Sequence, residues 1–255
     1  MKAGQIILLV TIVILPRFAH AQIVNIEDRR NILTDTTGVF GSADAGFSLN
    51  ENGKTVLTLT ANVTAEIIKH DRRWLAITNY SVVRAGEESF VNQGFQHLRF
   101  NKRLRKRLTW EAFGQAQYNE RLRIRFRGLL GTGPRFRLSK KKADRLFLGT
   151  LYMFQYEELN EVGIIHRDHR LSAYLSYRLR FAENINLTGT TYYQPLLTDF
   201  SVVRLSSQTA MQFNFTKNLA FKTTFNISLD NRLSKEIEGV PTATYSLITG
   251  IKWIF

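Results

Sequence analysis

The last eleven residues of the chain alternate between large apolar side chains and smaller or polar ones. Every second residue, counted back from the end, gives Phe255, Trp253, Ile251, Thr249, Leu247 and Tyr245. Successive side chains of a strand point to opposite faces, so this segment predicts a β-strand with one apolar face and aromatic rings at both ends of it. Such a face is typical of a lipid-facing strand in an outer-membrane barrel. We interpret Tyr245, Trp253 and Phe255 as parts of a terminal signal for barrel assembly.

The alternation continues back to Gly38, interrupted by charged or turn-forming clusters. It predicts strands at 38–50, 54–69, 73–84, 91–102, 107–118, 121–138, 145–158, 167–181, 184–197, 201–216, 219–230 and 243–255. Single-chain bacterial barrels have an even number of strands, and this count satisfies that rule. The predicted fold is all-β: an antiparallel transmembrane β-barrel of about twelve strands over residues 38–255.

A soluble β-sandwich is the main alternative fold, because its strands alternate too. Sandwich strands are usually shorter than these, and a sandwich does not need an aromatic-rimmed terminal strand. No stretch after the amino terminus approaches the length of about 18 apolar residues that a spanning helix needs, so only a closed barrel would cross a membrane. We therefore favour the membrane barrel.

The amino terminus has the parts of a secretory signal peptide. Lys2 precedes an apolar run at 6–15, and Ala19 and Ala21 provide small residues at alternate positions. We expect cleavage after Ala21, which makes 1–21 the signal peptide and 22–37 a periplasmic lead-in segment. The apolar run is too short to span a bilayer as a helix. The chain contains no cysteine, which excludes disulfides, thiolate metal sites and lipid attachment to a cysteine.

Charge is sorted between the two sets of predicted connections. The chain has 35 Lys and Arg against 21 Asp and Glu. The even-numbered connections carry basic clusters at 69–73, 102–107, 140–142 and 217, and we call their side the basic end. The odd-numbered connections carry acids at 51, 87–88, 120, 158, 161, 199, 236 and 238, and we call their side the acidic end. Glu183, Arg232 and Lys235 are exceptions. We expect the basic end and both termini to face the periplasm.

Arginine alternates with apolar residues at 121–127 and again at 135–137. On strands these arginines would share the inner face of the barrel. The predicted lumen-facing basic residues are Arg123, Arg125, Arg127, Arg135, Arg137, Arg178, Arg180 and Arg204. The predicted counter-charges are Glu66, Glu111, Glu157 and Asp230. One interpretation is that these charges pair across a narrow interior and fill it. The other is a small passage or pocket that favours anions, because guanidinium groups bind carboxylate and phosphate bidentately.

Other chemistry receives little support from the residues. Nucleic acid is disfavoured, because the arginines face inward and no exposed aromatic platform accompanies them. His166 and Asp168 share a face but His169 takes the other, so a metal site is not expected. His169 and Ser172 also lie on opposite faces, and no G-x-S-x-G motif occurs. We expect no cofactor and no enzymatic activity, with a lipid-modifying enzyme ranked below the other readings. The outer connections look too short to form an elaborate lid.

Three stretches resemble a known family. They are Gly38 to Asn50, Trp110 to Glu120, and Leu129 to Arg137. Together they resemble the outer-membrane β-barrel family of unknown function that contains the YdiY-like proteins. The resemblance implies a barrel in the outer membrane of a Gram-negative bacterium, in contact with lipid and folded by the barrel assembly machinery. It carries over no catalytic or binding residue. We expect a monomer, with a structural or docking role or with small anions as possible cargo.

Overall fold

Twelve strands form one antiparallel sheet in the computed structural model. The structure describes residues 37–51, 53, 55–86, 88–139, 144–160 and 163–253, without the side chains of 88–90 and 252. The predicted signal peptide, the lead-in segment up to residue 36 and the terminal Phe255 lie outside these residues. The strands are β1 (Gly38–Glu51), β2 (Thr55–Lys69), β3 (Arg72–Ala85), β4 (Glu88–Arg105), β5 (Leu108–Asn119), β6 (Ile124–Arg137), β7 (Arg145–Leu159), β8 (Ile165–Ala182), β9 (Ile185–Pro195), β10 (Val203–Asn214), β11 (Leu219–Asp230) and β12 (Ala243–Trp253).

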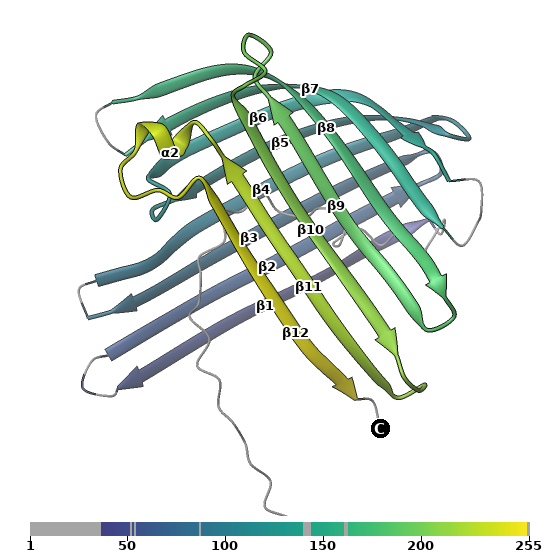
Figure 1. Ribbon diagram of the computed structural model, residues 1–255, viewed down its shortest axis with the longest axis horizontal. Coiled ribbons are helices and arrows are strands. Elements are labelled where there is room, and N and C mark those ends of the chain that lie inside the picture. The colour runs from purple at the N-terminus through teal and green to yellow at the C-terminus, as the bar shows by residue number, and fades with distance from the viewer. Residues whose placement is uncertain are drawn as a thin grey trace, which may run out of the picture.

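Each strand pairs with its neighbours in chain order, so the sheet is a continuous meander. The sheet curls around an interior, and a short helix, α2 (Leu233–Glu236), lies at one end of it (Figure 1). The all-β class, the antiparallel pairing and the strand number are confirmed. The sheet is not closed among the described residues, because β1 pairs only with β2 and β12 only with β11. Within the described part of the chain, no helix is long and apolar enough to cross a membrane.

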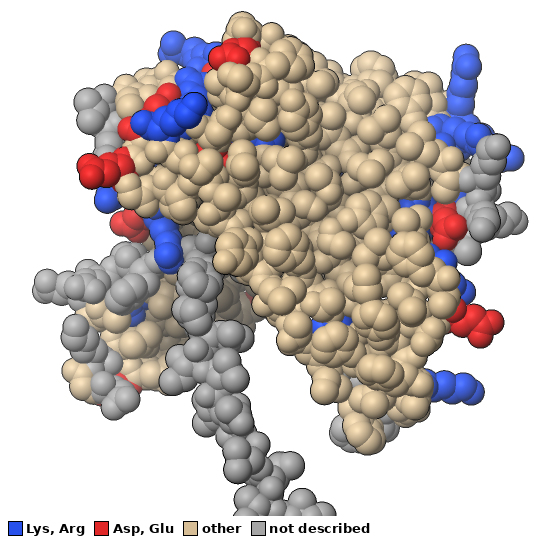
Figure 2. Space-filling model, in the orientation of Figure 1, with Lys and Arg blue, Asp and Glu red and all other residues tan. Residues whose placement is uncertain are grey.

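The two faces of the sheet have opposite character. Glu111, Phe113, Gln117 and Asn119 of β5 are buried inside, whereas Trp110, directly before Glu111, is exposed outside. Large exposed apolar side chains cover the outside of most strands: Phe47, Val63, Leu98, Leu130, Leu175, Phe225, Leu247 and Ile251 are examples. Figure 2 shows the consequence on one wall, where charged side chains gather toward the two ends and the middle is almost free of them.

Exposed aromatic rings concentrate near the ends of the strands. Trp74, Trp110, Phe136, Phe181 and Trp253 lie toward the basic end, and Phe47, Phe126, Tyr193 and Tyr245 lie toward the acidic end. Trp74 packs at 5.3 Å from the ring of Phe100 on the neighbouring strand, and Trp110 Nε1 donates a hydrogen bond to Thr132 Oγ1 at 2.9 Å. The predicted assembly residues Tyr245 and Trp253 are both exposed on the outer face of β12.

Candidate functional site

The centre of the interior contains a carboxylate that is held by three side chains. Glu111 on β5 is fully buried. Arg99 Nη1 on β4 lies 3.0 Å from Glu111 Oε2, and Arg135 Nη1 on β6 lies 3.3 Å from Glu111 Oε1. The hydroxyl of Tyr174, on β8, also donates a hydrogen bond to Oε2. Two cations and a hydroxyl therefore satisfy this one carboxylate, as a buried charge requires.

Aromatic rings support the arginines of this cluster, and inward glycines make room for the rings. The guanidinium carbon of Arg99 lies 5.2 Å from the ring centre of Phe113, within the range of a cation–π contact. Phe113 is paired with Gly131 across the β5–β6 ladder, and Tyr174 is paired with Gly149 across the β7–β8 ladder. A Cβ on Gly149 would lie only 2.1 Å from the Tyr174 ring. These glycines let the rings lie flat against the wall of the barrel.

A second cluster joins walls that share no backbone pairing. Glu157 on β7 accepts hydrogen bonds from Arg127 on β6 and from Arg204 on β10, whose Nη2 lies 2.7 Å from Oε2. Arg204 also donates to Asp230 on β11 and to Gln155 on β7. Arg127 Nη2 is 3.8 Å from Asp230 Oδ2. Since β7 and β10 are separated by two strands, these side chains cross the interior.

A third cluster continues the network toward the acidic end. Arg170 on β8 is fully buried and donates to the backbone oxygen of Gln194 at 3.0 Å and to Asp168 Oδ2 at 3.0 Å. Asp168 also accepts two hydrogen bonds of 3.0 Å from Arg232 Nη1, which belongs to the connection between β11 and β12. Gln194 Nε2 donates to Ser172 Oγ at 3.1 Å. The three clusters place charged or amide side chains at successive levels of the interior.

The β11–β12 connection, residues 231–242, covers part of the acidic end. Its residues Leu233 and Ile237 are buried in an apolar cluster with Ile124 and Leu159, at the ends of β6 and β7 that face this connection. Arg232 is further fixed by Glu236, whose Oε1 is 2.9 Å from Arg232 Nε. The sequence predicts outer connections too short for an elaborate lid, and this segment, which we call the lid, contains a single helix of four residues. The apolar side chains of α2 and its flanks make this short segment adhere to the strand ends.

Two charged residues in the connections have shifted pKa values. Burial lowers the pKa of Arg232, but hydrogen bonds to Glu236 and Asp168 outweigh that effect and raise the pKa above its ordinary value. Hydrogen bonds from the side chain and backbone of Ser201 lower the pKa of the exposed Asp199. Both groups therefore remain charged at neutral pH, and the link from Arg232 of this connection to Asp168 on β8 does not depend on a change of protonation at Arg232.

Most of the residues predicted to face the lumen are found there. Arg127, Arg135 and Arg204 are buried in the interior, as are Glu66, Glu111 and Glu157, and Asp230 joins them through its bonds to Arg204. Glu66 lies 3.4 Å from Arg73, measured from Oε1 to Nε. Arg137 and Arg178 are half-buried on the inner side toward the basic end, and Arg180 is exposed there.

The predicted positions of Arg123 and Arg125 were wrong. Arg123 lies in the turn before β6 with a φ of 56°, and it is exposed. Arg125 is exposed as well, and its Nη1 lies 2.7 Å from Glu158 Oε1 at the rim. The β6–β7 register shifts between Ile124 and Phe126, which breaks the simple alternation at this point. As a result Ile124, expected outside, is buried beneath the lid.

The sequence reading missed three arginines of the network: Arg99, Arg170 and Arg232. Arg99 shares its inner face with Phe95 and His97, so alternation within the predicted strand 91–102 would have placed it inside. Arg170 alternates with Leu171 in the predicted strand 167–181, and the same alternation places it on the polar face, but it does not indicate a partner. Nothing in the local sequence of Arg232 indicates that it meets Asp168, 64 positions earlier.

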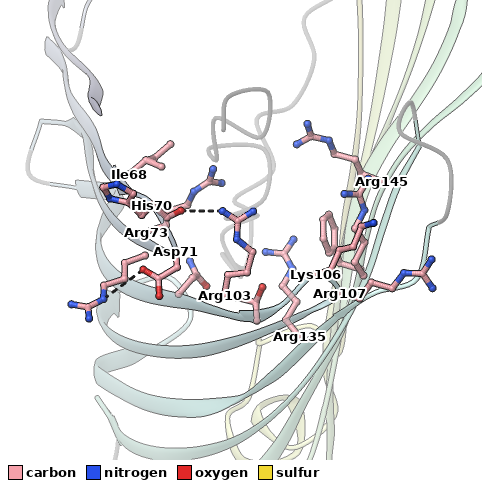
Figure 3. Close-up of a pocket in the computed structure, with 14 residues that line it drawn as sticks. Ile68, His70, Asp71, Arg73, Arg103, Lys106, Arg107, Arg135 and Arg145 are labelled. Atoms are coloured by element: carbon pink, nitrogen blue, oxygen red, sulfur yellow. Dashed lines mark hydrogen bonds and ion pairs between the residues drawn. The ribbon is translucent and has the colours of Figure 1, made fainter. Parts of the chain in front are cut away.

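A basic cavity of about 210 Å³ opens at the basic end of the barrel. The turns between β2 and β3 and between β4 and β5 form one part of its wall, and the adjoining ends of β6 and β7 form the other. Figure 3 shows Arg73, Arg103, Lys106, Arg107 and Arg145 around this space. Asp71 is the one acidic residue among the residues that line it. This excess of cations contrasts with the paired charges of the central clusters.

The two histidines considered as metal ligands are engaged elsewhere. His166 Nε2 lies 2.7 Å from Glu236 Oε2, whereas His169 contacts the ring and hydroxyl of Tyr152. The described part of the chain contains no group of three or more His, Cys, Asp or Glu residues arranged to hold a metal ion.

Comparison with known proteins identifies the family. The sequence profile of a family described as a protein of unknown function, DUF481, matches residues 32–248. The chain belongs to the DUF481 family. This confirms the resemblance to a barrel family of unknown function. No curated protein matches the chain.

Two solved structures show a distant likeness to this DUF481 chain. One is OccK11 (OpdR) of Pseudomonas aeruginosa, with a TM-score of 0.38 and 10% identity. The other is a deltaS2 mutant of the TodX monoaromatic hydrocarbon channel, with a TM-score of 0.36 and 10% identity. Each similarity covers 85% of this chain and 79% of the other.

Proposed function

We propose that this DUF481 protein is a monomeric integral barrel of the bacterial outer membrane with a narrow interior, and that it serves a structural or docking role. The observation that carries the proposal is the bridging of β7 and β10 by Arg204 and Glu157. Long side chains that meet across the interior occupy the space a solute would need. A barrel of about twelve strands is intermediate between eight-stranded barrels filled by side chains and open porins of sixteen or more, so side-chain filling decides whether it conducts.

The membrane location is supported by the exterior. An apolar wall with aromatic rings toward both strand ends matches the hydrocarbon core and the two headgroup levels of a bilayer. A soluble protein rarely exposes so much contiguous apolar surface. Membrane lipid and the barrel assembly machinery are the partners that this location implies, and no nucleic acid or cofactor enters the proposal. Heat-modifiable gel migration together with membrane fractionation tests it, and recovery as a soluble periplasmic protein would refute it.

A small anion-favouring passage is the second candidate. The basic cavity favours it, because it places several cations at one mouth of the interior. The proposed role is not catalytic: the interior residues described above are engaged with one another in ion pairs and amide contacts. Ser172, for example, accepts a hydrogen bond from Gln194.

Single-channel recording of the purified full-length protein in a planar bilayer separates the two candidates. We expect no steady conductance from the wild-type protein. Steady conductance that prefers chloride to potassium, and loses this preference in Arg127→Gln with Arg204→Gln, would establish the passage instead. Arg123→Gln with Arg125→Gln is the matched control, since it removes two cations that lie at the acidic rim.

A further inference from the structure

We propose that the basic cavity binds a phosphate group. This site goes beyond the role proposed above and does not require the barrel to conduct. The cavity lies at the basic end, where the β2–β3 and β4–β5 turns meet the adjoining ends of β6 and β7. Its rigid wall, its unbalanced charges and its size all favour such a ligand.

Backbone and side-chain contacts fix the wall of the cavity. The backbone N–H of Arg103 donates to the backbone oxygen of Asp71 at 2.7 Å, and Arg103 Nη2 donates to the backbone oxygen of His70 at 3.0 Å. These two bonds tie the β4 end to the β2–β3 turn. On the other side, the N–H of Arg137 donates to the backbone oxygen of Arg107 at 2.9 Å. The backbone of the wall and the side chain of Arg103 are therefore fixed before any ligand arrives, which lowers the entropic cost of binding.

The charges of the lining are strongly unbalanced. Eight Lys and Arg side chains line the cavity, and the single acid, Asp71, lies 3.9 Å from Arg72. Glu66 and Glu111, which lie deeper, offset the charges of Arg73 and Arg135. Lys106 and Arg107, two of these eight, lie in the β4–β5 turn. Like charges gathered in a confined space repel one another, so an anion that enters is stabilised by all of them.

The form of the donors and the volume favour phosphate. Guanidinium groups match phosphate oxygens with two parallel N–H bonds, and a phosphate dianion balances more of this charge than a carboxylate does. The volume of about 210 Å³ greatly exceeds what a single water needs, yet it is below the roughly 300–1,000 Å³ of sites that enclose a drug-sized ligand. The cavity would thus hold a phosphate or pyrophosphate group while the rest of the ligand stays outside.

Two sources would supply such a group. Trp74 and Trp110 mark the headgroup level at this end of the wall, so a lipid phosphate could reach the cavity from the membrane. A soluble phosphate ester could reach it from the aqueous side. The chemistry of recognition is the same for both.

Calorimetry on the purified full-length protein in detergent, with inorganic pyrophosphate as the probe at about 0.15 M salt, tests the site. We expect saturable binding that weakens by about tenfold or more in Lys106→Gln with Arg107→Gln, because both changes remove charge-assisted hydrogen bonds. The control, Arg123→Gln with Arg125→Gln, removes the same charge at the other end and should change the affinity by less than about twofold. Heat-modifiable migration verifies folding, and Arg107→Gln against Arg125→Gln is the substitute pair if a double variant does not fold.

Native mass spectrometry identifies the source. Retention of phosphatidic acid, but not of diacylglycerol, would indicate a lipid phosphate; pyrophosphate binding without lipid retention would indicate a soluble ligand. Both results support the site if Lys106→Gln with Arg107→Gln abolishes them. Absence of binding by both probes, or equal losses in the variant and its control, would overturn the proposal. Neither assay measures conductance. Failure of the phosphate-site proposal is therefore distinct from failure of the proposed closed barrel.

Discussion

Arg204 on β10 donates hydrogen bonds to both carboxylate oxygens of Glu157 on β7. The Nη2 atom of Arg204 lies 3.0 Å from Glu157 Oε1 and 2.7 Å from Oε2. The two strands are not neighbours in the sheet, so this ion pair connects parts of the wall that share no backbone pairing. Both side chains are almost completely buried, and Asp230 and Arg127 complete the cluster. The pair therefore fills part of the interior, and loss of one partner would leave the other charge buried and uncompensated.

Removal of Arg204 should destabilise the barrel. Arg204→Ala leaves the buried Glu157 without its main bridging partner, and breaking a buried ion pair on one side typically costs about 3–5 kcal/mol. Urea unfolding in lipid vesicles, followed by tryptophan fluorescence, measures the change in the free energy of unfolding. Arg125→Ala is the control, because its ion pair with Glu158 is exposed and should contribute little. Equal losses in the two variants would contradict a specific role for the bridging pair.

Gly149→Ala should destabilise the aromatic support of the Glu111 cluster. The added Cβ would lie 2.1 Å from the Tyr174 ring, so the ring has to leave its place against the wall. Overpacking of this kind typically costs about 1–3 kcal/mol. In Gly250→Ala the Cβ meets nothing within 4 Å, which makes this the matched control. A Gly149→Ala protein as stable as Gly250→Ala would show that the ring moves freely.

A charge on the outer face of β12 should impair membrane assembly. Leu247→Arg places a cation against lipid near the middle of the strand, at a cost of about 2–4 kcal/mol at the midplane. Ser246→Arg, the adjacent position on the inner face, should be milder. The fraction of heat-modifiable protein in isolated membranes reports the outcome. If Ser246→Arg assembles as poorly as Leu247→Arg, the assignment of faces is incorrect.

Ile237→Asp should release the lid at the acidic end. Ile237 is buried against Ile124 and Leu159, and an unpaired carboxylate there is unfavourable. Faster hydrogen exchange of residues 231–242 is the expected result, by at least about tenfold if the local free energy of opening falls by about 1.4 kcal/mol. Lys235→Asp, on the exposed side of the same connection, provides the control. Unchanged exchange in Ile237→Asp would mean that the apolar contacts do not hold the lid.

The sequence by itself determined the class of the fold and the faces of its strands. Alternate residues of a strand point to opposite faces, so each set faces either outward or inward. The contrast between apolar Leu247 and polar Ser246, or between Trp110 and Glu111, decides which set faces outward. All twelve strands, as far as the described residues reach, begin and end within three residues of the predicted limits. Alternation also placed Arg127, Arg135 and Arg204 inside.

Only the tertiary structure decided which interior charges meet and what covers the acidic end. The partnership of Arg204 with Glu157 depends on how the sheet curls, and no local pattern encodes the distance between β7 and β10. The register shift beside Ile124 reversed the expected faces of the first residues of β6, since one extra residue in a ladder changes the side to which every earlier side chain points. Arg232 and Ile237 have partners 64 or more positions away, because the path of a connection depends on where its apolar and charged groups find complementary contacts.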